Sequence, residues 1–125
     1  MVYVIGATYW RDNVRLLWIS GRVMGKDLAE TTETNLASNL GLAGVKATLV
    51  SPGTASNENF DHIQIKRTEL PGLETLSAAR NLSIFLNSNG DLISNADLVL
   101  VDWRYVRPLR RELSKLPTKW AIIDR

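Results

Sequence analysis

Residues 14–21 read VRLLWISG, a nearly continuous apolar run that ends on a serine and a glycine. Such a run is typical of a strand that is buried on both faces of a parallel sheet. A longer amphipathic stretch follows, and a second apolar run, Val45–Val50, closes on Ser51–Gly53. Apolar strands that alternate with amphipathic helices predict βαβ units. The first fifty or so residues therefore predict an α/β fold.

Three further strands continue this pattern, at His62–Ile65, Ala96–Val101 and Trp120–Arg125. The run over 96–101 is the strongest strand signal in the chain, as expected for an inner strand. These segments predict a Rossmann-like α/β fold. We expect an open, mainly parallel sheet of about five strands in the order 3-2-1-4-5, with helices on both faces.

Local signals place the helices between these strands. Asp27 and Glu30 have the spacing of a capping box, so the first helix is expected to begin there. Its sheet-facing stripe is expected to comprise Leu28, Thr32, Leu36 and Leu40. A second helix is expected from about Leu73, with a stripe of Leu76, Ala79, Leu82 and Leu86. A third is expected between Pro108, which suits a first helical turn, and Pro117, which ends it.

The two ends of the chain lead to different expectations. Met1–Asn13 does not fit the alternation, and it is interpreted as an extension or an added edge strand. Residues 14–125 are expected to form one domain, since 125 residues of 45% hydrophobic content can build a single core. A parallel strand that ends on polar residues, here Asp124 and Arg125, normally leads into a loop and a helix. We therefore expect the chain to be part of a larger protein.

Composition excludes several kinds of site. Cysteine is absent, which excludes disulfides, thiolate metal sites and a cysteine nucleophile. His62 is the only histidine, so no zinc site can be built from histidines, and a structural role is expected for it. The net charge of +2 is weak support for a polyanionic partner, and no nucleic-acid motif accompanies it. No run approaches the length of a membrane span, and a cytoplasmic location is expected.

Ligands of open parallel sheets bind at the carboxyl ends of the strands. Five polar or glycine-rich groups follow the expected strands: Ser20–Asp27, Ser51–Thr54, Arg67–Glu69, Asp102–Arg107 and Asp124–Arg125. In the first group, Gly21 and Gly25 precede a helix N-terminus, where free N–H groups suit an anion or a sugar hydroxyl. Equally, the two glycines can serve only to make a tight turn. The spacing matches neither a dinucleotide fingerprint nor a P-loop.

Asp102 directly follows the strongest apolar run and is flanked by Trp103 and Arg104. Its carboxylate can accept a hydrogen bond from a sugar hydroxyl or act as a base, and Trp103 can stack on a sugar ring. The alternative is an Asp–Arg pair that structures the loop, with Trp103 buried beneath it. Both interpretations remain open at this point.

A dense basic cluster follows, with Arg107, Arg110, Arg111, Lys115 and Lys119. Such spacing can meet anionic lipid headgroups or a pyrophosphate-linked acceptor, so peripheral membrane contact is considered. The ordinary explanation is a solvated helix face. Nucleic acid is not expected, because no aromatic platform accompanies the charges.

Several segments together resemble a known enzyme family. They are Arg15–Gly21, the helix expected over Leu28–Leu42, and Gly44–Gly53 with its closing Ser-Pro-Gly turn. In this order they resemble the N-terminal part of the sequence of a GT-B glycosyltransferase, in particular of the retaining enzymes called group 1 or family 4. Asn95–Trp103 is similar to the strand that leads to the acceptor cleft in these enzymes, although many members carry a histidine where this sequence has Asp102.

The resemblance implies that residues 14–125 are the N-terminal, acceptor-side half of such an enzyme. The C-terminal donor domain lies outside these residues, so the chain alone is expected to be inactive. The resemblance further implies a nucleotide-sugar co-substrate, an acceptor, no cofactor and no metal. It gives a tentative catalytic role to Asp102 and substrate-binding roles to Gly21, Gly25, Lys26, Trp103, Arg104 and Arg125.

A different class of protein also fits the predicted sheet: a flavodoxin-like or receiver-like module that binds a ligand or partner without chemistry. A receiver needs an acidic pair after its first strand and an aspartate after its third. Here those places hold Ser20–Gly21 and Arg67, which disfavours the signalling version.

Overall fold

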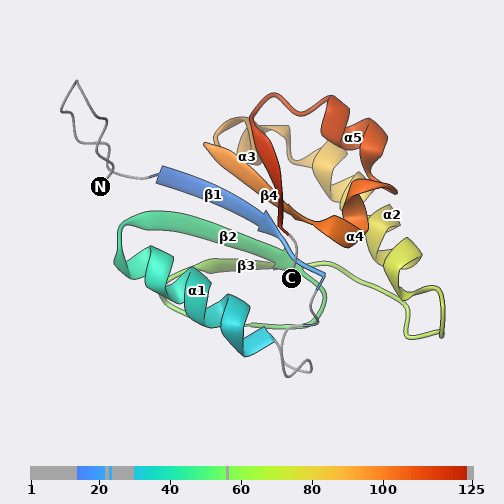
Figure 1. The fold of residues 1–125 in the computed structure, drawn as a ribbon, viewed down its shortest axis with the longest axis horizontal. Helices are drawn as coiled ribbons and strands as arrows, with labels where there is room; N and C mark the ends of the chain where they lie inside the picture. Colours follow the sequence, from blue (N-terminus) through green and yellow to red (C-terminus); the bar gives the residue numbers. More distant parts are fainter. Residues whose placement is uncertain (1–13, 22, 24–29, 56, 124–125) are drawn as a thin grey trace.

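A computed structural model describes residues 14–21, 23, 30–55 and 57–123 (Figure 1). The expected N-terminal edge strand within residues 1–13 lies outside this part. Five strands form one sheet in the order β3-β2-β1-β4-β5, and every neighbouring pair is parallel. The strands are β1 (Val14–Ile19), β2 (Val45–Ser51), β3 (Asp61–Gln64), β4 (Leu98–Asp102) and β5 (Trp120–Ile123). The predicted Rossmann-like sheet and its strand order are confirmed.

The helices are α1 (Glu30–Leu42), α2 (Glu74–Ser88), α3 (Gly90–Ser94), α4 (Trp103–Val106) and α5 (Arg110–Ser114). One helix was expected after β4, but the structure has two short ones, with Pro108 between them. Because proline lacks an N–H group, it interrupts a helix that has already begun at Trp103. A second difference is α3, a short helix after α2 that was not expected from the sequence.

The helices cover both faces of the sheet (Figure 1). Side chains alternate along β1, so Leu17 and Ile19 join the large apolar cluster with α2, α3, α4 and α5, whereas Trp18 joins a small cluster with Ala37 of α1. Trp18 and Ile19 are fully buried, as expected for the central strand. No helix within the described ranges is long and apolar enough to cross a membrane.

The expected sheet-facing stripe of α1 is wrong at Leu36, and its other described member, Leu40, is only half-buried. Leu36 is 42% exposed, and the buried positions are Glu33 and Ala37. Leu28 and the side chain of Thr32 lie outside the described residues. The face of α1 that carries Ala37 and Gly41 is buried because the helix packs closely there. A Cβ atom at Gly41 would lie 1.9 Å from the backbone oxygen of Asn59. The face that carries Ala37 and Gly41 has the small side chains that this approach requires.

The stripe of α2 is largely confirmed, with one exception at its first turn. Ala79, Leu82 and Leu86 are buried as expected, but Leu76 is 61% exposed and Phe85 takes part in the core. Leu76 lies in the first turn of α2, and its exposure shows that the buried stripe begins one turn later, at Ala78 and Ala79.

Candidate functional site

A row of polar side chains runs across the carboxyl edge of the three central strands. Ile19 of β1 pairs with Val50 of β2 and with Val101 of β4. The next residues, Ser51, Ser20 and Asp102, are therefore neighbours, and the alternation of side chains places them on the α1 face of the sheet. All three are buried. This row lies directly after the apolar layer of the strands, at the edge where α/β sheets bind ligands.

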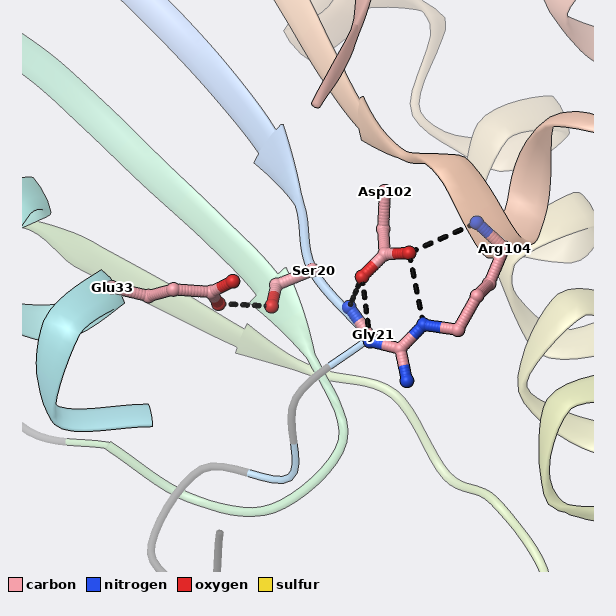
Figure 2. A network of polar contacts seen from close by, with 5 residues as sticks. All are labelled: Ser20, Gly21, Glu33, Asp102 and Arg104. Carbon is pink, nitrogen blue, oxygen red and sulfur yellow. Dashed lines mark hydrogen bonds and ion pairs between the residues drawn. The ribbon is translucent and has the colours of Figure 1, made fainter. Parts of the chain in front are cut away.

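Asp102 accepts four hydrogen bonds from two residues (Figure 2). The Gly21 N–H donates to its Oδ2 atom at 3.0 Å, and the Arg104 backbone N–H donates to Oδ1 at 2.9 Å. The Arg104 guanidinium binds the same carboxylate through two bonds, from Nε to Oδ1 at 3.0 Å and from Nη2 to Oδ2 at 2.8 Å. Asp102 thereby caps α4 and joins the end of β1 to the end of β4.

These contacts set the charge state of the pair. Burial disfavours the ionised form of Asp102, but the hydrogen bonds and the charge of Arg104, together with the Gly21 N–H, outweigh it and lower its pKa. The hydrogen bond to Asp102 also raises the pKa of Arg104. A carboxylate with a lowered pKa and four donors is a weak base. The geometry therefore favours the Asp–Arg pair over a general base for Asp102.

This arrangement requires a glycine at position 21 because there is no room for a side chain there, and not because the backbone conformation demands one. A Cβ atom at this position would lie 2.6 Å from Arg104 Nη2 and 2.7 Å from Asp102 Oδ2. Any larger residue would thus push the guanidinium away from the carboxylate. The glycine does more than allow a turn: it lets the backbone approach the ion pair.

Arg104 retains donor capacity beyond Asp102. Its Nη1 atom is the third guanidinium nitrogen, and Figure 2 shows it pointing away from the carboxylate. The Arg104 side chain is 36% exposed. A guanidinium held on one edge by a carboxylate is pre-oriented toward a second acceptor, such as a hydroxyl, carboxylate or phosphate oxygen.

Glu33 and Ser20 form the second polar contact of the row. The Ser20 hydroxyl donates to Glu33 Oε2, and Glu33 is only 2% exposed (Figure 2). Glu33 lies in the first part of α1, so this contact ties the helix to the end of β1. Glu33 was not expected at the site, because the predicted stripe of α1 is shifted by one residue and places Glu33 away from the sheet.

The row continues through Ser51 to the edge strand β3. The Ser51 hydroxyl shares a hydrogen bond of 2.7 Å with His62 Nε2. His62 pairs with Leu49 in the sheet and so faces the α1 side. Burial lowers the pKa of His62, which favours the neutral ring. His62, for which a structural role was expected, thus forms a hydrogen bond with a member of the polar row.

The other expected site residues fall into two groups. Trp103 is 52% exposed and begins α4 beside Asp102, so it does not lie beneath the ion pair. Gly25, Lys26 and Arg125 lie outside the described residues. Among the residues that the structure describes, no group of three or more histidine, aspartate or glutamate side chains can hold a metal ion.

Arg67 follows β3 and has an unusual environment. Its Nε atom is buried without a hydrogen-bond partner, while its Nη2 atom lies 3.6 Å from Glu69. The charge of Arg67 acts on Tyr105 of α4, whose pKa burial raises to about 12. Burial outweighs the charge of Arg67, which acts on the pKa of Tyr105 in the opposite direction.

Comparison with known proteins supports the fold. No protein-family model matches the sequence, and neither does any curated protein. Two similar solved structures are a UGT transferase from Siraitia grosvenorii in complex with UDP, and UGT2 of Phytolacca americana complexed with UDP-2fluoro-glucose and pterostilbene. The first is 15% identical with a TM-score of 0.58 over 87% of this chain. The second is 15% identical with a TM-score of 0.63 over 93%.

The present chain spans only 27% of the first of these proteins and 31% of the second. At this identity the likeness is one of fold. The five-stranded sheet therefore has a Rossmann-like α/β fold similar to a part of these two proteins.

Proposed function

We propose that this chain is the acceptor-side domain of a glycosyltransferase that uses a nucleotide-sugar donor. The observation that carries the proposal is the Gly21–Asp102–Arg104 cluster at the carboxyl edge of a glycosyltransferase-like sheet. The two similar structures hold UDP or a UDP-sugar analogue, which supports this class of donor. Both are much longer than the present chain, so the remainder of the enzyme is proposed to supply the donor site.

In this proposal Arg104 binds the acceptor and Asp102 positions Arg104. The carboxylate fixes the guanidinium through Nε and Nη2, so that Nη1 points outward to an acceptor oxygen. Trp103, half exposed next to the pair, offers a flat apolar surface for a sugar or aromatic ring. Closure of a second domain over this edge would bring the acceptor hydroxyl to the anomeric carbon, an effect of proximity and orientation.

The proposal is tested on the full product of the gene that encodes this chain. Release of nucleoside diphosphate is measured with a panel of nucleotide-sugars and acceptors. Trp103→Ala is expected to raise the acceptor KM about fivefold while kcat changes little, because it removes the half-exposed surface proposed to stack on the acceptor. Arg104→Gln is expected to lower kcat/KM by about tenfold or more.

Two control variants accompany this test. Leu76→Ala removes an apolar side chain that is 61% exposed on α2, and Arg80→Gln removes an exposed arginine of the same helix. Neither is expected to change KM. Absence of sugar transfer and of nucleotide-sugar binding would overturn the proposal. Binding of a small ligand without any transfer would instead favour the flavodoxin-like module.

The finer assignment to the retaining group 1 or family 4 enzymes belongs to the same proposal. A retaining enzyme forms a product with the anomeric configuration of its donor, which the coupling constant of the anomeric proton reports by NMR. A product of opposite configuration would contradict this assignment while leaving the transferase proposal intact. Because no metal is proposed, a chelator is expected to leave the rate unchanged.

A further inference from the structure

A cationic surface lies away from the polar row, on the side of the sheet that α5 covers. Arg107, Arg110 and Arg111 line one open concavity of about 640 Å³, together with Pro108, Glu112 and Ser114. The three arginines are exposed. We refer to Arg107, Arg110 and Arg111 as the arginine surface.

The charges of the arginine surface are not neutralised by nearby acids. Within the described part of the chain, no carboxylate forms an ion pair with these three arginines. Glu112 is the one acidic residue that lines the concavity, and its Oε1 atom accepts a hydrogen bond of 2.9 Å from Ser83 of α2. This bond draws the carboxylate toward the neighbouring helix, so the cations are left to face solvent.

The charge is also strongly localised in the sequence. Residues 107–119 contain five cations, namely the arginine surface with Lys115 and Lys119, and one anion, Glu112, which is a net charge of +4. The whole chain carries +2, so the remaining residues together carry −2. Attraction to a polyanion is therefore directed to one side of the molecule.

The shape of the concavity indicates the kind of partner. Its lining side chains are solvated and contribute no buried polar group, whereas a pocket for one small anion holds it with buried donors. No aromatic side chain lines it, so it lacks the stacking platform typical of single-stranded nucleic acid sites. Lys115 and Lys119 are exposed and extend the charge beyond the concavity. A broad layer of phosphate groups matches this distribution better than a single ligand does.

We propose that the arginine surface docks this protein on an anionic lipid membrane by binding the phosphates of lipid headgroups. The contact is peripheral and electrostatic, and it orients α5 toward the lipid. It does not depend on the proposed transferase function, because none of these residues belongs to the polar row.

The proposal is tested by sedimentation with lipid vesicles. The protein is expected to bind vesicles of phosphatidylcholine with about a quarter phosphatidylglycerol and not vesicles of phosphatidylcholine alone. Raising the salt from about 0.1 M to about 0.5 M should release it, since the Debye length shortens. The double variant Arg110→Gln/Arg111→Gln should bind about thirty-fold more weakly, and Arg107→Gln alone about fivefold.

A matched control removes the same charge elsewhere. Arg15 and Lys46 are exposed, and they are paired neighbours in β1 and β2 at the amino end of the sheet. Arg15→Gln/Lys46→Gln should keep vesicle binding within about twofold of the unaltered protein, because these two cations lie at the amino end of the sheet and neither lines the concavity of the arginine surface. Circular dichroism confirms that each variant is folded.

Three outcomes would overturn the proposal. The first is equal loss of binding in the control pair and in the arginine pair, which would mean that only net charge matters. The second is equal binding to neutral and anionic vesicles. The third is binding of a single-stranded oligonucleotide or of inorganic phosphate, sensitive to Arg110→Gln/Arg111→Gln, without binding to vesicles.

Discussion

The two faces of the sheet are built differently. The face under α2, α3, α4 and α5 carries one large apolar cluster of buried residues, among them Leu82, Phe85 and Val99. The face under α1 carries a cluster of five buried residues, and the polar row replaces apolar contacts at its carboxyl edge. Apolar burial supplies most of the free energy of folding, whereas buried polar groups mainly fix orientation. The α2 face therefore stabilises the domain, and the α1 face positions the site.

The largest expected effect tests the role of the α2 face. Leu82 of α2 is 1% exposed, so Leu82→Ala removes buried methyl groups and leaves a cavity. We expect it to lower the free energy of unfolding by about 3 kcal/mol, measured by urea denaturation. Ile84→Ala, at a position 56% exposed on the same helix, should change it by less than about 0.5 kcal/mol. Equal effects of the two variants would refute the assignment of stability to this face.

The next largest effect concerns the packing of α1. In Gly41→Ala the new methyl group meets the backbone of Asn59, which cannot rotate away as a side chain can. We expect this substitution to lower the free energy of unfolding by about 2 kcal/mol, measured by thermal or urea denaturation. A Cβ atom at Gly90 meets nothing within 4 Å, so Gly90→Ala should be neutral or slightly stabilising. If Gly41→Ala were equally harmless, α1 would not lie as close to the 51–60 loop as described.

A smaller effect is expected from the ion pair in the polar row. Asp102→Asn replaces the carboxylate, which accepts four hydrogen bonds, with an amide. We expect this change to lower the free energy of unfolding by about 1.5 kcal/mol at neutral pH, measured by urea denaturation. This value lies at the low end for a charged acceptor, because the Arg104 side chain is 36% exposed and water screens the pair.

The pH dependence of this effect has a definite sign. The folded pKa of Asp102 lies below its ordinary value of 3.8, so the unfolded chain takes up the proton first as the pH falls. The stability that Asp102 contributes is complete above about pH 5 and is lost as the pH falls below 3.8 toward the folded pKa. The difference between the unaltered protein and Asp102→Asn in urea unfolding should shrink over that range. A difference that stays constant at low pH would contradict the proposed pairing.

The smallest effect concerns His62 at the other end of the row. Burial lowers its pKa below 6.5, so the unfolded chain binds the proton more readily and stability falls as the pH drops below 6.5. One proton limits this slope to about 1.4 kcal/mol per pH unit. His62→Gln can still bond to Ser51 but does not titrate, so unfolding curves between pH 7 and 5.5 should lose this slope. An unchanged slope would assign the pH dependence to other groups.

The strands could be predicted from the sequence because continuous apolar runs reveal inner parallel strands directly. β1, Val14–Ile19, coincides with the apolar part of the run over residues 14–21, and the strand order followed from the general rules of βαβ connections. The stripe of α1 was not predictable in the same way. Its contact with the sheet depends on Ala37 and Gly41, whose small side chains give a weak apolar signal.

The position of the candidate site could be predicted from the sequence, but the hydrogen bonds and ion pair between its residues could not. The strand-end rule placed Gly21, Asp102 and Arg104 at one edge, where the structure brings them together. Sequence reasoning left two roles open for Asp102, because the choice depends on which donors surround the carboxylate in three dimensions. The Ser20–Glu33 and Ser51–His62 contacts were not predicted, because each of them joins two residues that no sequence motif relates.

The wide separation of Gly21 and Asp102 along the chain, 81 residues, has a consequence for biosynthesis. Parallel neighbours cannot pair through a short hairpin, and the central strand must wait for a partner made much later. A ribosome therefore releases β1 with one flank open until β4 has emerged from the exit tunnel. Throughout that interval the nascent chain displays an apolar strand with one unpaired edge, the kind of surface that chaperones shield.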